Sequence, residues 1–489
     1  MNRAVRAVSA LAAALVALPG CPSREVSQVE LGQERQESEQ IPIEPVRDVD
    51  ILFVIDNSDS MAEEQASLVE NFPRFIGKLE GIDGGLPNIQ IAVISTDMGG
   101  APSAYGGCDG ANGDDGTLQS DFVGSNAACS DGTVSLDPGA TFLRDVEDPD
   151  QPDARIRNYS GMLDDSANLA QVFACMAELG IEGCGFEQPL EAMRRALEKD
   201  TGFLRPNAYL AVIFITDEDD CSAFDNAMFT PRETPALGQP DSFRCFEFGV
   251  QCNPDVARSE GDKYDCVPRE DSPFMHGVDE YVSFLKGIKD PSQIIVAGIV
   301  GVDPDNGPVS VFTEERVGDD GSEPATFHVL SPACETQDGA GAVIGKAAPA
   351  VRLGYFFDQF GQNSTTTTIC DQDLTDALDV IGNLLAARIG DPFCLTADVD
   401  LDHDPANGLQ YDCQVSDVQP PTTADALPTE TPVQECDAAR SKLPCWTIEL
   451  NEATCANEGG VPPYQYLVVE RGDEVAPPNT EVVLRCALK

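Results

Sequence analysis

Four uninterrupted apolar runs divide the chain: ILFVI at 51–55, IQIAVI at 89–94, YLAVIFI at 209–215 and IIVAGIV at 294–300. These runs are rich in β-branched residues and do not alternate with polar positions, which is typical of parallel strands buried on both faces. Segments with helical spacing lie between and after them, such as EEQASLVENFPRFIGKL directly after the first run. Strands that alternate with helices predict an α/β fold with an open, mainly parallel sheet.

Two long stretches interrupt this predicted Rossmann-like sheet. One covers about 97–166 and is rich in Gly, Asp and Ser, and the other covers about 218–277 and carries four cysteines. Both are too long for ordinary loops, so we expect insertions that are held by disulfides. Because both begin directly after an apolar run, they should rise at the carboxyl ends of strands and form the walls of a binding surface there.

The composition changes again after about residue 395. Short strand-like runs follow, WTIEL, YQYLVVE and EVVLRCAL, with cysteines spread among them. This pattern predicts a small disulfide-rich β module over 396–489, joined to an α/β domain over 47–395.

The first 20 residues have the features of an export signal. Two arginines precede the apolar run ALAAALVAL, and the sequence Leu-Pro-Gly-Cys ends the segment at Cys21. This order resembles a bacterial lipobox and predicts a lipoprotein signal peptide over 1–20, with Cys21 carrying lipid. An ordinary secretory signal is the alternative. Pro22, where Asp would resemble a retention signal, favours the outer membrane. Residues 21–46 are polar and predict a flexible tether.

The cysteine count agrees with export. The chain has 17 cysteines, and removing Cys21 leaves an even number. No Cys-x-x-Cys motif occurs and there are three histidines, so zinc and redox motifs have little support. We therefore expect disulfides formed in an oxidising compartment. The local pairs that the spacing suggests are Cys108–Cys129, Cys175–Cys184 and Cys245–Cys252.

The charge balance excludes one class of partner. The chain has 30 basic and 84 acidic residues, a formal net charge of −54. Such a surface repels nucleic acid and anionic lipid, so membrane contact should come through the lipid anchor alone. It also attracts divalent cations, although most of these carboxylates need no role beyond solubility.

Polar side chains follow two of the apolar runs. Asp56, Ser58 and Ser60 follow the first run, and Thr216-Asp217-Glu218-Asp219-Asp220 follows the third. In an open α/β sheet, ligands bind at the carboxyl ends of the strands. If these two strands are neighbours, Asp56 and Asp217 face one cation site. Carboxylates with hydroxyls and waters suit Mg²⁺, with Mn²⁺ or Ca²⁺ as alternatives.

The two motifs DILFVIDNSDSM and FITDEDD resemble those of a von Willebrand factor A (VWFA) domain with its metal-ion-dependent adhesion site (MIDAS). The resemblance covers about residues 48–390. It implies that Asp56, Ser58, Ser60 and Asp217 are metal ligands, and that the metal keeps one position open for an acidic group of a partner. It also implies adhesion rather than catalysis.

One part departs from the family pattern. The family has a threonine before a helix such as EQPLEAMRRAL, whereas this chain has Cys184 or a neighbour in that place. A thiol is a poor Mg²⁺ ligand, and a disulfide would remove it altogether. Glu187 is the candidate substitute metal ligand.

These observations predict a lipid-anchored protein of the cell envelope that is not an enzyme. It would bind a protein or polymer partner through a divalent metal at the strand tips. The alternatives are a structural envelope scaffold without metal-mediated recognition and a carboxylate-based hydrolase. No histidine stands beside a recognisable catalytic motif, so a catalytic triad has no support.

Overall fold

The computed structural model describes residues 35–41 and most of 47–488. Its gaps fall at 83–84, 101–107, 109–112, 121, 123–126, 149–150, 164, 207, 305, 317–323, 338–339, 372, 390–393, 396, 401–409, 420–428, 438–441, 452–454, 456–461 and 471–480. The predicted signal peptide, Cys21 and the ends of the predicted tether lie outside the described residues.

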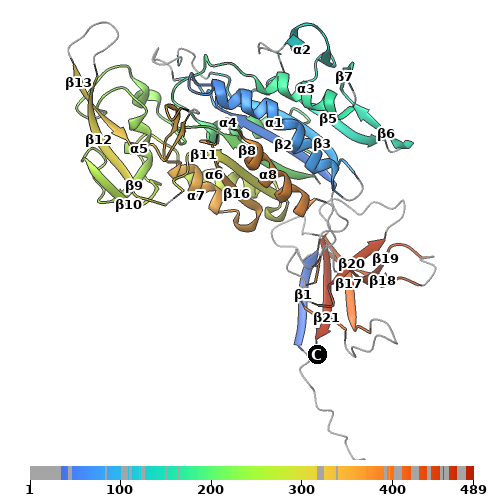
Figure 1. Cartoon of the computed structure of the whole chain (residues 1–489). Coiled ribbons are helices and arrows are strands. Elements are labelled where there is room, and N and C mark those ends of the chain that lie inside the picture. The colour runs from blue at the N-terminus through green and yellow to red at the C-terminus, as the bar shows by residue number, and fades with distance from the viewer. Residues whose placement is uncertain are drawn as a thin grey trace, which may run out of the picture.

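A seven-stranded sheet forms the centre of the larger domain (Figure 1). Its order is β16 (Ser364–Thr368), β11 (Ile294–Val300), β8 (Tyr209–Ile215), β2 (Asp48–Ile55), β3 (Asn88–Ser95), β5 (Leu143–Asp148) and β6 (Gln151–Arg157). The four apolar runs form β2, β3, β8 and β11, and these strands with β16 are parallel. The α/β prediction is therefore confirmed.

The Rossmann-like, mainly parallel description is not confirmed. β5 and β6 come from the first predicted insertion and join the sheet antiparallel to β3 and to each other. Only two residues separate the end of β5 from the start of β6, so these two strands run in opposite directions. The main sheet is mixed, and most pairings in the other sheets are antiparallel.

Helices cover both faces of the main sheet. One face carries α1 (Ala62–Glu80), α3 (Asp165–Ala177) and α8 (Thr375–Arg388), and the other carries α4 (Pro189–Glu198), α6 (Val278–Ile288) and α7 (Val351–Asp358). Alternate residues of β2 therefore enter two separate cores. Phe53 packs against Phe173 on the first face, with ring centroids 4.8 Å apart, and Leu52 and Val54 pack on the second. This two-sided burial explains why the strand shows no polar alternation.

Smaller elements surround the sheet. The first stretch also holds α2 (Ala127–Ser130), β4 (Val134–Leu136) and β7 (Tyr159–Gly161). The second holds α5 (Phe243–Gly249), β9 (Val250–Asn253) and β10 (Gly261–Pro268). β10 pairs with β12 (Val309–Arg316), which pairs with β13 (Ala325–Leu330), so this sheet extends beyond the predicted boundary. A hairpin of β14 (Cys334–Gln337) and β15 (Val343–Ala347) follows.

The C-terminal module is a six-stranded sheet that includes a strand from the N-terminal part of the chain. Its order is β1 (Arg35–Ile41), β21 (Glu481–Leu488), β17 (Cys413–Gln419), β18 (Thr429–Glu435), β19 (Cys445–Leu450) and β20 (Gln465–Glu470). β1 lies in the segment that the sequence predicts to be a tether, and it pairs antiparallel with β21. Figure 1 shows the module as a separate body beside the larger domain.

Eight disulfides join all 16 cysteines other than Cys21. None of the three local pairs predicted from spacing is correct: Cys108 and Cys129 pair with residues beyond the first insertion, and Cys245 and Cys252 pair with other cysteines of the second. The pairs are Cys108–Cys184, Cys129–Cys175, Cys221–Cys245, Cys252–Cys266, Cys334–Cys370, Cys394–Cys455, Cys413–Cys486 and Cys436–Cys445. Among the described residues, no helix has the length and apolar character needed to span a membrane.

Candidate functional site

The carboxyl ends of β2 and β8 meet at one edge of the main sheet. The two strands are parallel neighbours, and the amide of Asp56 donates to the carbonyl of Ile215 at 2.9 Å. Asp56 and Asp217 therefore leave adjacent strand ends, as the sequence predicts. We call Asp56, Ser58, Ser60, Glu187 and Asp217 the strand-tip site.

Hydrogen bonds hold Asp56 in place at this edge. Its Oδ1 accepts from the amide of Ser58 at 2.8 Å, and its Oδ2 accepts from the hydroxyl of Thr216 at 2.6 Å. The hydroxyls of Ser58 and Ser60 lie 3.1 Å apart. Burial raises the pKa of Asp217, and the nearby Ser60 hydroxyl offsets part of that rise. The two serines thus stand between the two carboxylates.

Glu187 reaches the strand-tip site from the segment before α4. It is buried and accepts a hydrogen bond from the Thr96 hydroxyl, and it lies close enough to Asp56 for the charge of that carboxyl to raise its pKa further than burial alone does. Cys184 does not take the place of the family's threonine as a ligand, because its sulfur is bonded to Cys108. Sequence reasoning missed the roles of Thr96 and Thr216, although Thr216 stands directly before Asp217.

Burial makes the charged forms of these carboxyls unfavourable. Burial is the largest cause that raises the pKa of Asp217, to about 8, and the charge of Asp56 adds to it. Burial likewise raises the pKa of Glu187 well above its usual range, with the charges of Asp56 and Glu218 adding. The largest contributions to these pKa shifts come from burial, neighbouring carboxyls and hydrogen bonds, and none of these comes from a lysine or an arginine.

Several oxygens at this edge are buried without a hydrogen-bond partner. They are Asp217 Oδ1, Glu187 Oε1, Asn57 Oδ1 and Glu64 Oε2. An unsatisfied buried oxygen is costly, and carboxylate, amide and hydroxyl oxygens are ligand types that hard divalent cations prefer. These residues therefore suit a small, hard cation that prefers oxygen ligands better than they suit a metal that prefers sulfur or nitrogen ligands.

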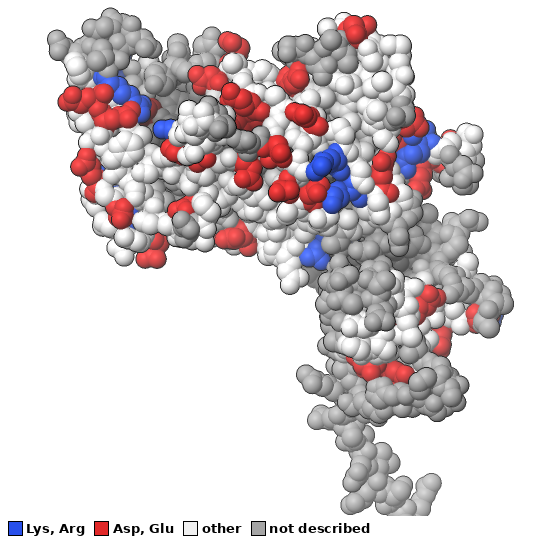
Figure 2. Space-filling view, viewed as in Figure 1, with Lys and Arg blue, Asp and Glu red and all other residues white. Residues whose placement is uncertain are grey.

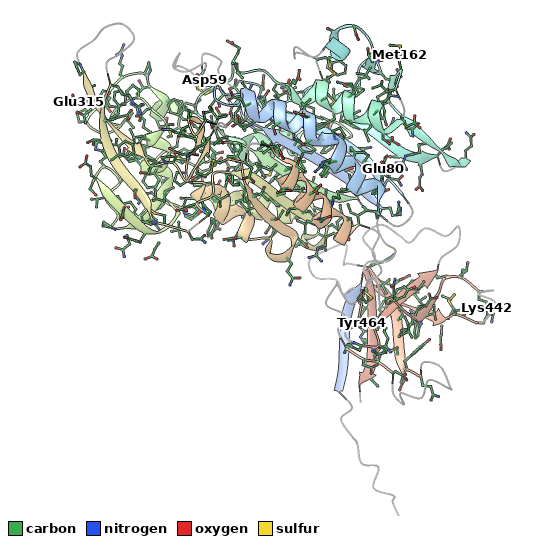
Figure 3. The ribbon with its side chains drawn as sticks, viewed as in Figure 1. Asp59, Glu80, Met162, Glu315, Lys442 and Tyr464 are labelled. Carbon is green, nitrogen blue, oxygen red and sulfur yellow. A yellow bond between two sulfur atoms is a disulfide. The ribbon has the colours of Figure 1, made fainter. Side chains whose placement is uncertain are left out.

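The two predicted insertions meet beside the strand-tip site. Cys108 from the first is bonded to Cys184, and Phe229 from the second packs on Phe186 with ring centroids 4.6 Å apart. These side chains belong to one buried cluster that also includes Cys221. Asp59, labelled in Figure 3, marks this end of α1, and Glu80 marks the opposite end.

The outer surface is strongly acidic. Figure 2 shows Asp and Glu side chains spread over the visible face of both bodies, with few Lys and Arg among them. This distribution agrees with the net charge of −54.

Comparisons with known proteins give no family. No family model matches the chain, and no curated protein matches it. Among solved structures, the pilus adhesin SpaC from Lactobacillus rhamnosus GG, in an open conformation, has a TM-score of 0.30 and 10% identity, and the match covers 91% of this chain and 39% of that one. The pilus adhesin RrgA from Streptococcus pneumoniae has a TM-score of 0.30 and 12% identity, with 94% and 60% covered. The adhesive tip pilin of Group B Streptococcus agalactiae has a TM-score of 0.29 and 11% identity, and the match covers 92% of this chain and 80% of that one.

This chain thus spans 39% and 60% of the first two adhesins. TM-scores this low assign neither a shared fold nor a function. The expected membership of the von Willebrand factor A family is corrected, because no family model matches the chain. The MIDAS assignment is corrected with it. Among the described residues, no three His, Cys, Asp or Glu side chains are arranged to hold a metal ion.

Proposed function

We propose that this chain is an exported binding protein of the cell surface that captures a protein or polymer partner at the strand-tip site. A divalent cation, Mg²⁺, Mn²⁺ or Ca²⁺, would be held by the carboxylates of Asp56 and Asp217 and by the hydroxyls of Ser58 and Ser60, with water completing its coordination. The observation that carries the proposal is a set of buried carboxyls whose charges repel one another and which retain unpartnered oxygens on Asp217 and Glu187. A cation would neutralise their mutual repulsion, and an acidic group of the partner would supply a further oxygen.

The connectivity of the chain supports presentation at a surface. β1 of the module ends at Ile41 and β2 begins at Asp48, so the module is joined to the larger domain at the amino end of β2. The strand-tip site lies at the carboxyl end of the same strand. With lipid on Cys21, the N-terminal anchor and the module would stand on the membrane side, and the site would point outward. The absence of Asp after Cys21 favours the outer membrane.

Calorimetric titration of the wild type with Mg²⁺, Mn²⁺ and Ca²⁺, alongside thermal unfolding, tests the cation. At about 100 times its dissociation constant, a bound ion should add roughly 2.7 kcal/mol to the free energy of unfolding. Asp56→Ala removes a buried carboxylate and should abolish this increment. Ser58→Ala should weaken it less, because water can replace a neutral hydroxyl.

Asp50→Asn is the matched control, since Asp50 is a buried carboxyl at the opposite end of the same strand. It should keep the full cation response. If no ion binds below millimolar concentration and Asp56→Ala unfolds like the wild type, the strand-tip site holds no cation. The structural envelope scaffold would then be favoured. Turnover of a polysaccharide or peptide library that depends on Asp217 would instead support the hydrolase.

A further inference from the structure

The acidic segment after β8 has two sides with different partners. Thr216 and Asp217 face the strand-tip site, as described above. Asp219 and Asp220 point away from it and bind the first turns of two helices. Both oxygens of Asp219 accept from the amide of Arg352, at 2.9 and 3.1 Å, and Oδ1 also accepts from the amide of Leu353.

Asp220 holds the start of α4 in the same way. Its Oδ1 accepts from the amide of Leu190 at 3.2 Å and from the hydroxyl of Ser222. That hydroxyl in turn accepts from the amide of Glu191 at 3.0 Å. Free amides at a helix start and the helix dipole both favour a carboxylate. The segment therefore fixes α4, whose preceding residues carry Glu187.

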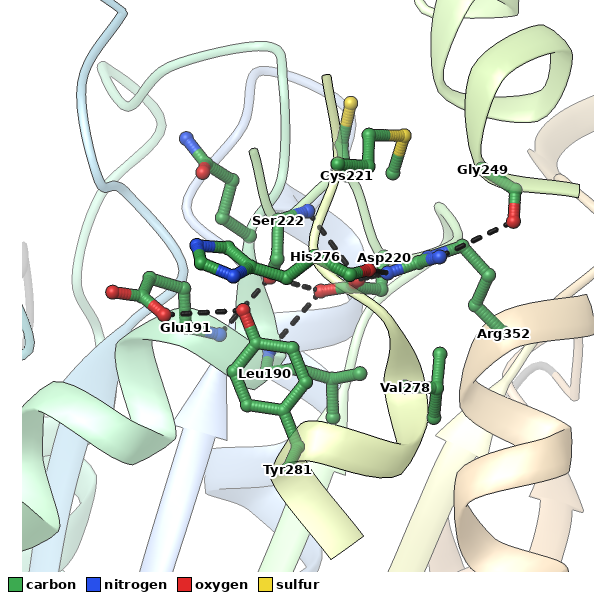
Figure 4. Close-up of polar contacts among 12 residues, drawn as sticks. Leu190, Glu191, Asp220, Cys221, Ser222, Gly249, His276, Val278, Tyr281 and Arg352 are labelled. Carbon is green, nitrogen blue, oxygen red and sulfur yellow. Dashed lines mark hydrogen bonds and ion pairs between the residues drawn. The ribbon is translucent and has the colours of Figure 1, made fainter. Parts of the chain in front are cut away.

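Arg352 of α7 is the basic partner of this network. Both Arg352 and Asp220 are fully buried, and Nη2 and Nε of Arg352 donate to Asp220 Oδ2 at 2.9 and 3.1 Å. The guanidinium also donates to the carbonyls of Gly249 and His276, at 3.2 and 2.8 Å. Figure 4 shows Arg352 reaching Asp220 from α7, with Gly249 on its other side. One side chain thus joins the strand tip, α7 and the second insertion.

Backbone contacts link this network directly to the strand-tip site. The amide of Cys221, next to Asp220, donates to the carbonyl of Glu187 at 2.7 Å. The carbonyl of Asp217 accepts from the amide of Ala348, three residues before α7, at 2.7 Å. A displacement of Asp220 or of the start of α7 would therefore move both Asp217 and Glu187.

We propose that Arg352 is a positioning residue, which holds Asp217 and Glu187 in the arrangement that the strand-tip site needs. Removing the guanidinium of Arg352 leaves the Asp220 carboxylate buried without a positively charged partner. This is unfavourable unless the segment that carries Asp220 moves toward water. The carbonyls of Gly249 and His276 lose a donor at the same time, so the second insertion loosens with it. This inference rests on the proposed function only for its effect on cation binding.

The test compares Arg352→Met with Arg352→Lys and with Arg205→Met. Arg205 is partly exposed and pairs with the buried Asp50 at 2.7 Å, so its loss breaks another ion pair to a buried aspartate, at the opposite end of the sheet. Three quantities are measured: the melting temperature, hydrogen exchange of peptides covering 187–191 and 216–222, and the dissociation constant for Mn²⁺.

Both methionine variants should lower the melting temperature. Only Arg352→Met should speed exchange in the two peptides, by tenfold or more, and weaken Mn²⁺ binding by a similar factor. Arg352→Lys keeps the positive charge, so its exchange rates and Mn²⁺ affinity should lie between those of the wild type and Arg352→Met. If Arg352→Met does not fold, the lysine variant provides the test. Unchanged exchange and unchanged Mn²⁺ affinity in Arg352→Lys and Arg352→Met would overturn the inference. A wild type that binds no Mn²⁺, combined with faster exchange in the Arg352 variants, would refute the proposed cation and support the positioning role.

Discussion

The Cys108–Cys184 disulfide gives a quantitative prediction about the edge of the strand-tip site. It closes a sequence separation of 76 residues, for which the chain-entropy relation gives about 4.5 kcal/mol at 25 °C. Cys129–Cys175 lies within this loop and shortens the effective path to about 30 residues, which lowers the expected contribution to about 3.6 kcal/mol. Replacing both Cys108 and Cys184 with alanine should therefore destabilise the protein by roughly 3–4 kcal/mol.

Urea unfolding of this double variant, compared with the wild type, measures the effect. The matched control is the double alanine variant of Cys252 and Cys266, whose separation of 14 residues predicts about 3 kcal/mol. Both variants should be destabilised by similar amounts, but only the first detaches the first insertion from the segment that carries Glu187 and should weaken cation binding. A loss below about 1 kcal/mol for the first variant, or alkylation of Cys184 in the unreduced wild type, would refute the reasoning.

Three further substitutions test the electrostatics and the packing of the larger domain. Burial raises the pKa of Asp50 from 3.8 to about 6, so folding takes up a proton at pH values between these two. The free energy of unfolding should therefore fall by up to about 3 kcal/mol as the pH rises from about 4 to about 6. Asp50→Asn should flatten this slope in pH-dependent urea unfolding. A Cβ on Gly298 would lie 2.2 Å from Cε2 of the buried Phe357, so Gly298→Ala should cost about 1–3 kcal/mol by thermal unfolding. Nothing lies within 4 Å of a Cβ on Gly354 in α7, so Gly354→Ala should stabilise the protein by about 0.5–1 kcal/mol. Equal effects of the two glycine substitutions on stability would contradict this account of the packing.

The sequence predicts those elements whose pattern reflects burial on both sides. β2, β3, β8 and β11 are continuous apolar runs because each contributes to two cores. β5 and β6 were missed because they extend one edge of the sheet with polar segments, LRDVED and QPDARIR. β1, with the sequence RQESEQI, has no apolar alternation, and its pairing partner lies more than 400 residues away.

The site was predictable as far as strand order could be inferred. Two acidic motifs that end two neighbouring parallel strands must share one edge of the sheet, which brings Asp56 and Asp217 together. The fate of Cys184 was not predictable, because its partner Cys108 belongs to an insertion whose path depends on tertiary packing. Arg352 was also missed, since nothing local distinguishes it from an exposed arginine in a short helix.

The shared sheet of the module leads to a last prediction. The module has its own core around Val415, Trp446 and Leu484, and the disulfides of Cys394, Cys413, Cys436, Cys445, Cys455 and Cys486 all lie within it. The fragment 394–489 should therefore fold, but without residues 35–41 it presents β21 as an unpaired edge. Exposed edges of this kind pair with other chains.

The oxidised fragment should consequently self-associate in gel filtration, and a peptide of residues 35–41 should return it to a monomer by adding the missing strand. The matched control peptide has proline at both Glu37 and Ser38, which face Cys486 and Arg485 in the native register. Neighbouring amides of a strand point to opposite sides, so the amide of either position 37 or position 38 points toward β21. With proline at both positions, the peptide lacks that donor in either case. A fragment that is monomeric without peptide, or that responds equally to both peptides, would mean that β1 contributes nothing to the stability of the module.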